Sequence, residues 1–222
     1  MGRSSVHPVL LLALASAALV IIIASIFVNG NLAGENPQNV ATAASLPYRT
    51  DLHDASRVLV GDATQGVPYF RIEPHWMDNF GERHCEECTM VEYSTGLKGT
   101  AGVAYVADKL YDFSEAKKVV VFVMGDKGGE KVSFSFAGKD LPAGTKVPAS
   151  KANLISGKIQ FPVTTNEITL ENDWQRLEIP LDKVNLDKTK YPFAFQVNSG
   201  DAPKVRFYVS EVFFDSQPVK TP

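Results

Sequence analysis

The residues with the clearest chemical potential stand together in the run His84-Cys85-Glu86-Glu87-Cys88, with His75 nine residues before His84. Cys85 and Cys88 are the only two cysteines of the chain. A disulfide between them would pin the loop that leads into a predicted strand over 89–94. Because the ring that it closes is short, we expect only a modest gain in stability from it.

Two other kinds of chemistry fit the same residues. Two thiolates together with His75 and His84 could coordinate zinc or copper. A redox centre is the third alternative, although redox Cys-x-x-Cys pairs normally open a helix and Glu86 and Glu87 would raise the pKa of the thiols. The order of residues is also the reverse of a c-type haem attachment motif. With one cysteine pair in the chain, the residues favour the disulfide.

No recognised catalytic motif appears elsewhere in the sequence. It contains no Gly-x-Ser-x-Gly, no His-Glu-x-x-His and no glycine-rich phosphate loop. His53 is isolated from other candidate groups in the sequence. We therefore predict a protein that is not an enzyme.

A group of aromatic residues precedes the cysteines. Tyr69, Phe70, Trp76 and Phe80 lie in a segment without the alternation of a strand, so we expect a loop there. Aromatic side chains exposed on a loop are typical of a binding surface, which makes Trp76 and Tyr69 candidate ligand-binding residues. The alternative is that these rings close one end of the core.

An apolar run over residues 9–28 predicts a transmembrane helix. At about 1.5 Å per residue it would span roughly 30 Å, the thickness of a bilayer core. Arg3 precedes the run and Glu35 is the first charge after it, so residues 1–8 are predicted to be cytoplasmic and the rest exported. A cleaved signal peptide is the alternative. Residues 29–46 are small and polar, as in a flexible spacer.

The remaining chain, 47–217 with a short tail over 218–222, has the pattern of an all-β domain. Apolar residues alternate with polar ones in several runs, namely Val132/Phe134/Phe136, Leu177/Ile179/Leu181, Phe193/Phe195/Val197 and Val205/Phe207/Val209. The run 119–124 is apolar throughout, as expected of a strand covered on both sides. Residues 125–129 predict a hairpin turn. Eight or nine short strands indicate a β-sandwich or jelly roll.

The charge balance argues against nucleic acid as a partner. Of the 222 residues, 21% are charged, and the formal net charge is −3. The lysines are scattered among acidic residues, without the one-sided basic stripe that nucleic-acid binding needs.

Four motifs in order carry a resemblance to a known family. They are Gly99-Thr100-Ala101-Gly102-Val103-Ala104-Tyr105, residues 110–118 followed by VVVFVMGDKGGEKVSFSFAGK, Asn172-Asp173-Trp174-Gln175-Arg176-Leu177-Glu178-Ile179-Pro180-Leu181, and residues 207–215. On these motifs the stretch from about 99 to 215 resembles the galactose-binding-like jelly rolls of carbohydrate-binding modules. The resemblance implies carbohydrate or envelope glycan as ligand, with Tyr105 stacking on a sugar and Trp174 packing in the fold. It also implies a structural calcium, for which Glu211 and Asp215 would be the ligands.

These observations lead to a membrane-anchored, extracytoplasmic, non-catalytic binding module as the predicted function. Two alternatives remain open at this point. The same fold could serve as a structural or assembly protein of the cell envelope through protein contacts. The segment with His75, His84, Cys85 and Cys88 could instead make it a metal-binding surface protein.

Overall fold

The computed structural model describes residues 40–61, 69–80, 83–94, 100–146, 158–198 and 204–219. The chain divides into two units, residues 1–40 and 41–222, and all the described strands belong to the second unit. Within the described ranges, no helix has the length and apolar character needed to span a bilayer. The predicted transmembrane segment 9–28 lies outside those ranges.

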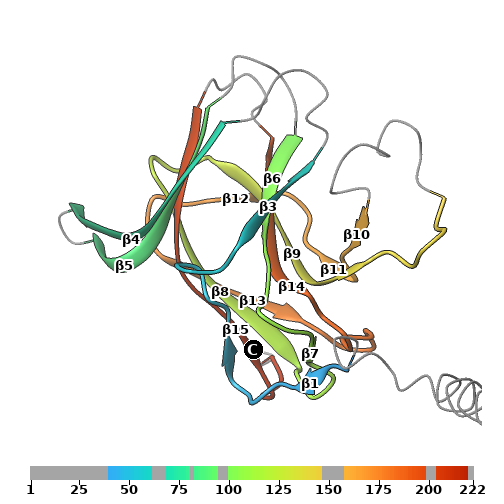
Figure 1. The fold of residues 1–222 in the computed structure, drawn as a ribbon. Coiled ribbons are helices and arrows are strands. Elements are labelled where there is room, and N and C mark those ends of the chain that lie inside the picture. The colour runs from blue at the N-terminus through green and yellow to red at the C-terminus, as the bar shows by residue number, and fades with distance from the viewer. Residues whose placement is uncertain are drawn as a thin grey trace, which may run out of the picture. The chain divides into compact units, whose positions relative to one another are not determined.

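Two antiparallel sheets face each other in the second unit (Figure 1). The first has the order β13-β8-β15-β5-β4, and β2 pairs with β15 at its margin. Its strands are β2 (Tyr48–Arg49), β4 (Tyr69–Phe80), β5 (Arg83–Ser94), β8 (Lys118–Gly125), β13 (Gln175–Pro180) and β15 (Lys204–Asp215).

The second sheet has the order β10-β9-β14-β6-β3, and two short strands, β11 and β12, also pair with β9. Its strands are β3 (Arg57–Gly61), β6 (Thr100–Tyr105), β9 (Lys131–Asp140), β10 (Ile159–Gln160), β11 (Val163–Thr164), β12 (Ile168–Thr169) and β14 (Tyr191–Asn198). A short parallel pair, β1 (Thr42–Ala43) with β7 (Tyr111–Asp112), completes the described strands.

Alternating apolar side chains from both sheets fill the core, as the sequence predicts. Residues of β9, β14 and β15 that share one face are fully buried in a single cluster, among them Phe134, Phe193 and Phe207. Phe195 of β14 meets Phe207 of β15 edge to face, with ring centroids 5.2 Å apart, although the two strands belong to different sheets. Such aromatic contacts bind the two layers together. The predicted all-β sandwich is confirmed.

The predicted hairpin over 125–129 is wrong. The turn joins β8 to β9, but β8 pairs with β13 and β15 in the first sheet, whereas β9 pairs with β14 in the second. The turn therefore carries the chain from one layer to the other. Its backbone bonds go to a third segment, because the N–H of Gly125 donates to the carbonyl of Glu171 and that of Gly129 to Leu170.

The loop expected between residues 69 and 88 is instead a pair of long strands, and this expectation is also corrected. β4 and β5 pair along their length, with register shifts between Glu73 and Trp76 and between Trp76 and Asp78. His75 and Glu87 have left-handed backbones, with φ of 56° and 57°. These irregularities interrupt the period-two pattern, so sequence alternation does not reveal the strands.

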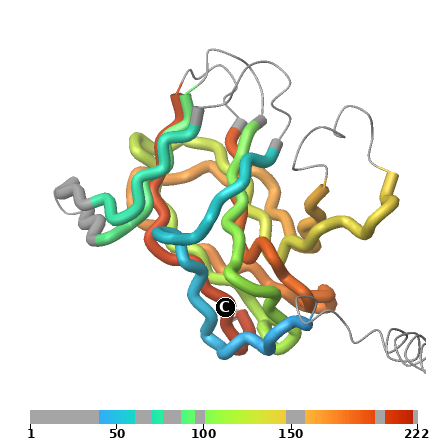
Figure 2. The backbone as a smooth tube through the Cα atoms, viewed as in Figure 1, coloured from blue at the N-terminus to red at the C-terminus, as the bar shows by residue number. Residues whose placement is uncertain are grey.

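The segment 48–57 crosses from one sheet to the other, as the blue tube in Figure 2 shows. At its start β2 pairs with β15 of the first sheet, and at its end β3 pairs with β6 of the second. Thr42–Ala43, which the sequence assigns to the spacer, pairs as β1 with β7. This N-terminal part of the domain thus closes one edge of the sandwich.

Candidate functional site

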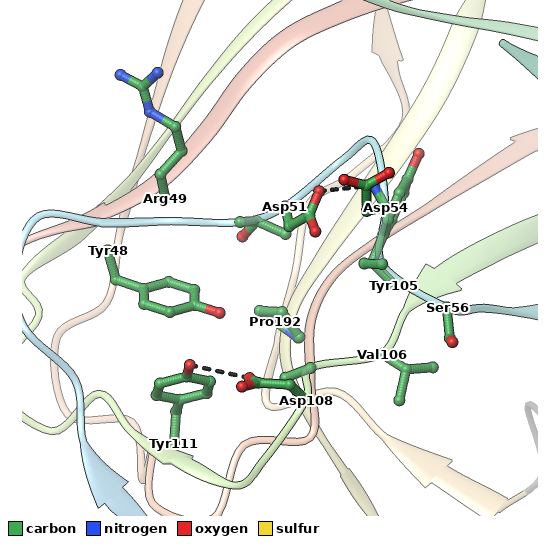
Figure 3. Close-up of a pocket in the computed structure, with 13 residues that line it drawn as sticks. Tyr48, Arg49, Asp51, Asp54, Ser56, Tyr105, Val106, Asp108, Tyr111 and Pro192 are labelled. Atoms are coloured by element: carbon green, nitrogen blue, oxygen red, sulfur yellow. Dashed lines mark hydrogen bonds between the residues drawn. The ribbon is translucent and has the colours of Figure 1, made fainter. Parts of the chain in front are cut away.

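A hollow of about 560 Å³ opens beside the crossing segment (Figure 3). We call it the tyrosine hollow because three tyrosines line it. The described residues that line it are Tyr48, Arg49, Thr50, Asp51, Asp54, Ala55, Ser56, Tyr105, Val106, Ala107, Asp108, Tyr111 and Pro192. Its volume falls in the range of small-molecule sites.

Backbone pairing from several segments fixes the walls of the hollow. β2 carries Tyr48 and is held by β15, while β7 carries Tyr111 and is held by β1. The N–H of Tyr111 also donates to the carbonyl of Thr189 across 3.0 Å. The N–H of Val106 donates to the carbonyl of Ser56 across 2.8 Å, which closes the crossing segment against the chain that follows β6. The walls are therefore built on paired strands.

Two tyrosine rings make an aromatic wall. The ring centroids of Tyr48 and Tyr111 lie 4.6 Å apart at 54°, and the ring of Phe113 packs edge to face on Tyr48 with centroids 4.9 Å apart. The hydroxyl of Tyr111 donates to Oδ1 of Asp108 across 3.0 Å. Burial, and then the neighbouring Tyr111, raise the pKa of Tyr48 well above its usual range. Burial and the bond to Asp108 also raise the pKa of Tyr111, so both phenols stay neutral at physiological pH.

The carboxylates of Asp51, Asp54 and Asp108 lie around the tyrosine rings, whereas the side chain of Arg49 points away from them (Figure 3). Oδ1 of Asp51 accepts the N–H groups of His53 at 2.8 Å and of Asp54 at 2.9 Å. Burial works to raise the pKa of Asp51, but these backbone donors outweigh it and hold the pKa below its usual value. Arg49 reaches Glu211 across 3.1 Å. With one arginine against three aspartates, the lining carries a net charge of −2.

This arrangement suits the binding of a small polar ligand with apolar faces. Aromatic rings offer flat apolar contact, while phenol hydroxyls and carboxylates offer hydrogen-bond donors and acceptors around them. A sugar ring presents both kinds of surface, since its C–H faces are apolar and its rim carries hydroxyls.

Tyr105 is the one predicted ligand-binding residue that the structure places in the hollow. It is only 1% exposed, and its ring stacks on Phe193 with centroids 5.7 Å apart. Burial raises its pKa to about 12, although Arg57 acts in the opposite direction. Tyr105 thus contributes to the floor of the hollow and to the core beneath it, and a stacking role toward a ligand stays a prediction.

Trp76, a second predicted ligand-binding residue, does not line the hollow. Trp76 packs on the outer face of the first sheet against the buried cluster of Cys88, Met90, Met124 and Tyr208. The side chain of Tyr69 lies outside the described part of the structure. Trp174 packs against the same cluster as Trp76, consistent with the structural role that the resemblance implies.

The Cys–His segment is described only in part. Cys88 is fully buried and carries no free thiol. The side chains of His84 and Cys85 lie outside the described part, so a disulfide between Cys85 and Cys88 stays a prediction. His75 is exposed, and its ring lies 4.1 Å from that of His53. Among the side chains that are described, no three His, Cys, Asp or Glu residues are grouped so as to hold a metal.

The two residues expected to hold calcium are each engaged with a basic side chain. Glu211 pairs with Arg49, and Asp215 lies 3.9 Å from the ammonium of Lys118. Both are on β15, four residues apart, which corresponds to about 13 Å along a strand. This geometry separates them, and a structural calcium at these residues stays a prediction.

Sequence reasoning missed most of the hollow. Tyr48, Asp51 and Asp108 come from segments without a motif, and their proximity follows from the pairing of β2 with β15 and of β3 with β6. Tyr111 lies within a motif that carries the family resemblance, yet nothing in its spacing marks it as a wall residue. The crossing of the N-terminal segment brings Tyr48 and Asp51 to Asp108 and Tyr111, which are near each other in sequence.

Searches with protein-family models and against curated sequences gave no match. Solved structures do match in fold. The family 30 carbohydrate-binding module of a cellulosomal cellulase of Clostridium thermocellum aligns with a TM-score of 0.51 and 16% identity, over 78% of this chain and 99% of that one. A second family 30 module aligns with a TM-score of 0.51 and 17% identity, over 78% of this chain and 100% of that one. A third aligns with a TM-score of 0.50 and 14% identity, over 79% of this chain and 92% of that one. At such low identities the similarity concerns the fold, and the chain shares the jelly-roll β-sandwich of these carbohydrate-binding modules.

Proposed function

We propose that this chain is a non-catalytic glycan-binding module whose tyrosine hollow receives a sugar ring. One observation carries the proposal: the paired rings of Tyr48 and Tyr111 face the carboxylates of Asp51, Asp54 and Asp108 within one hollow of about 560 Å³. The fold shared with carbohydrate-binding modules supports it.

Each side of the hollow would contact a different part of the sugar. The C–H face of a pyranose packs on an aromatic ring, as apolar surfaces do elsewhere. Its hydroxyls donate to carboxylates, and bonds to charged acceptors are stronger than bonds between neutral groups. Because the rings and the Asp51 carboxylate are held in place before binding, little side-chain freedom is lost when the ligand enters.

A glycan array followed by calorimetry tests the proposal. Residues 41–222, the compact unit, would be used together with Tyr111→Ala and Tyr111→Phe. We expect retention of glycans by the unaltered protein, about tenfold weaker binding by Tyr111→Ala, and a smaller loss for Tyr111→Phe, which keeps the ring. Failure to retain any glycan, or equal affinity for all three proteins, would contradict the proposal.

We further propose that the module is held outside a membrane by residues 9–28. The uninterrupted apolar run and the charge bias around it support this placement. Fractionation of cells that produce the full chain should recover it with membranes, and added protease should digest the domain without lysis. Recovery in the soluble fraction with protection from protease would refute this arrangement.

A further inference from the structure

A second hollow flanks the same crossing segment. It also has a volume of about 560 Å³, and it shares Arg49, Thr50 and Asp51 with the tyrosine hollow. Its other lining residues are Leu52, His53, Glu87, Ser210 and Glu211. We call it the Ser210 hollow. The two hollows therefore adjoin along a single stretch of three residues.

The hydroxyl of Thr50 has no hydrogen-bond partner within the described part of the protein. Thr50 is only 4% exposed, and its Oγ1 is buried. A buried hydroxyl without a partner costs free energy, and proteins rarely retain one. Thr50 lines both hollows, so a ligand that passes between them would run along this residue.

Two backbone irregularities shape the Ser210 hollow. Ser210 is the extra residue where the pairing of β15 with β8 shifts, between Val209 and Glu211. Such a bulge turns a side chain out of the regular alternation and is frequent beside binding sites. Glu87 has a left-handed backbone with φ of 57°, which is costly for a residue with a side chain and is concentrated at functional sites.

The charge of the combined surface indicates which ligands it accepts. Among the described residues of the two linings, Arg49 is the only lysine or arginine, and it is paired with Glu211 across 3.1 Å. Against it stand five carboxylates, those of Asp51, Asp54, Glu87, Asp108 and Glu211. This excess of negative charge repels uronic acids and sulfated sugars, whereas uncharged hydroxyls can donate to the carboxylates.

We propose that the two hollows are successive subsites for one linear, uncharged oligosaccharide that straddles the stretch Arg49–Asp51. The hydroxyl of Thr50 bonds a sugar hydroxyl at the crossing point. Arg49, whose side chain is 69% exposed and pairs with Glu211 of the Ser210 hollow, donates to ring or linkage oxygens. This inference rests on the proposed glycan-binding function and adds to it the length and the charge of the ligand.

Calorimetric titration of the full chain in detergent, with ladders of neutral and anionic oligosaccharides, tests the inference. The probes are cello-oligosaccharides and manno-oligosaccharides of one to six rings, with oligogalacturonates of equal length as anionic counterparts. We expect affinity for a neutral ladder to rise at least tenfold between the shortest and longest members, and anionic chains to bind at least tenfold more weakly.

Two variants separate the subsites. Ser210→Trp fills the Ser210 hollow and should reduce the affinity for the longest oligosaccharide about tenfold, to the affinity of the short ones. The affinity for short oligosaccharides should be unchanged. Ser216→Trp, at an exposed position in neither lining, is the matched control. Thr50→Val keeps the shape of the side chain and should weaken the binding of long oligosaccharides about fivefold. The unfolding temperature of this variant should be unchanged or raised. Thr50→Val also serves if Ser210→Trp does not fold.

The outcomes distinguish the two levels of the proposal. The extended site is overturned if short and long neutral oligosaccharides bind with equal affinity. It is also overturned if neither variant changes the ratio of the long-chain affinity to the short-chain affinity. Either result leaves glycan binding intact. Preference for the anionic ladder overturns the assignment of an uncharged ligand alone. Absence of binding to either ladder, together with an empty glycan array, overturns the proposed function and this inference with it.

Discussion

The hydroxyl of Tyr111 donates a hydrogen bond to Oδ1 of Asp108 across 3.0 Å, and this bond joins the aromatic wall of the tyrosine hollow to its acidic side. Tyr111 belongs to β7, whereas Asp108 lies in the turn that precedes it. The bond restrains the phenol ring and orients the carboxylate at the same time. A change at either residue should therefore affect both.

Replacing Asp108 with alanine should weaken glycan binding by about fivefold to thirtyfold, or about 1–2 kcal/mol. The change removes an acceptor for the ligand and releases the ring of Tyr111. Isothermal calorimetry with a glycan found on the array measures the effect. Asp182→Ala, an exposed position outside the hollow, is the control and should bind as the unaltered protein does. Unchanged affinity in Asp108→Ala would place the sugar elsewhere.

Tyr105 should behave differently, because it is part of the core as well as of the hollow. Tyr105→Ala should lower the free energy of unfolding by about 3–5 kcal/mol, since it removes a buried ring that stacks on Phe193. Loss of binding by this variant would therefore not show a ligand contact. Tyr105→Phe keeps the ring, and denaturant unfolding should show that it keeps most of the stability.

The glycan affinity of Tyr105→Phe then measures the contribution of the Tyr105 hydroxyl to binding. An affinity equal to that of the unaltered protein assigns Tyr105 to the floor of the hollow. A fall of more than threefold, with stability retained, would restore the direct ligand contact that the sequence resemblance implies.

The layers of the fold could be predicted from the sequence because one physical rule decides them. Strands with one face in the core alternate in hydrophobicity, and Phe134, Phe195 and Phe207 sit in the core as their spacing requires. The partner of each strand is not encoded in that spacing. The residues of the turn after Gly125 therefore predict a hairpin, although the turn connects two sheets.

The candidate site was much harder to predict, because long-range pairing assembles it. Tyr48 and Tyr111 are more than sixty positions apart in sequence, and their rings come within 4.6 Å only because β2 and β7 pair with other strands. Left-handed residues such as His75 and Glu87 also hide strands from periodicity. Features of this kind depend on tertiary context, which no local pattern of residues contains.

An ion-pair cluster on the first sheet should govern part of the stability. The carboxylate of Glu92, 8% exposed, accepts from Nε of Arg206 at 2.8 Å and lies 2.7 Å from Nζ of Lys204. Glu92→Gln should lower the free energy of unfolding by about 1–2 kcal/mol at pH 7. This is less than for a fully buried pair, because both basic partners are partly exposed to solvent.

The same cluster predicts a pH dependence. Burial acts to raise the pKa of Glu92, but Lys204 and Arg206 outweigh it and lower the pKa below 4.5. Because the pKa of Glu92 is lowered in the folded state, the stability that its ion pairs contribute is present above pH 4.5. It is lost as the pH falls through the pKa of Glu92 in the folded protein. The stability difference between the unaltered protein and Glu92→Gln should therefore shrink on acidification. Glu115→Gln, a change at an exposed position, is the control and should have the stability of the unaltered protein both at pH 7 and in acid.

Asp51 should link the stability of the crossing segment to ligand binding. Asp51→Ala removes the acceptor for the N–H groups of His53 and Asp54, as the loss of a helix cap does, and should cost about 0.5–2 kcal/mol of stability. Asp51→Asn keeps an acceptor oxygen in the same place, so it should retain most of that stability. Both variants remove a carboxylate that lines the two hollows.

Comparison of the two variants separates the structural role of Asp51 from its electrostatic role. If the negative charge sets ligand preference, Asp51→Asn should unfold nearly as the unaltered protein does, yet should discriminate less against anionic glycans in calorimetry. Backbone donors hold the pKa of Asp51 below its usual value despite the opposing effect of burial, so Asp51 should still carry its charge in mildly acidic solution. Unchanged discrimination in Asp51→Asn, with stability lost only in Asp51→Ala, would restrict Asp51 to shaping the segment, because the charge would then have no part in choosing the ligand.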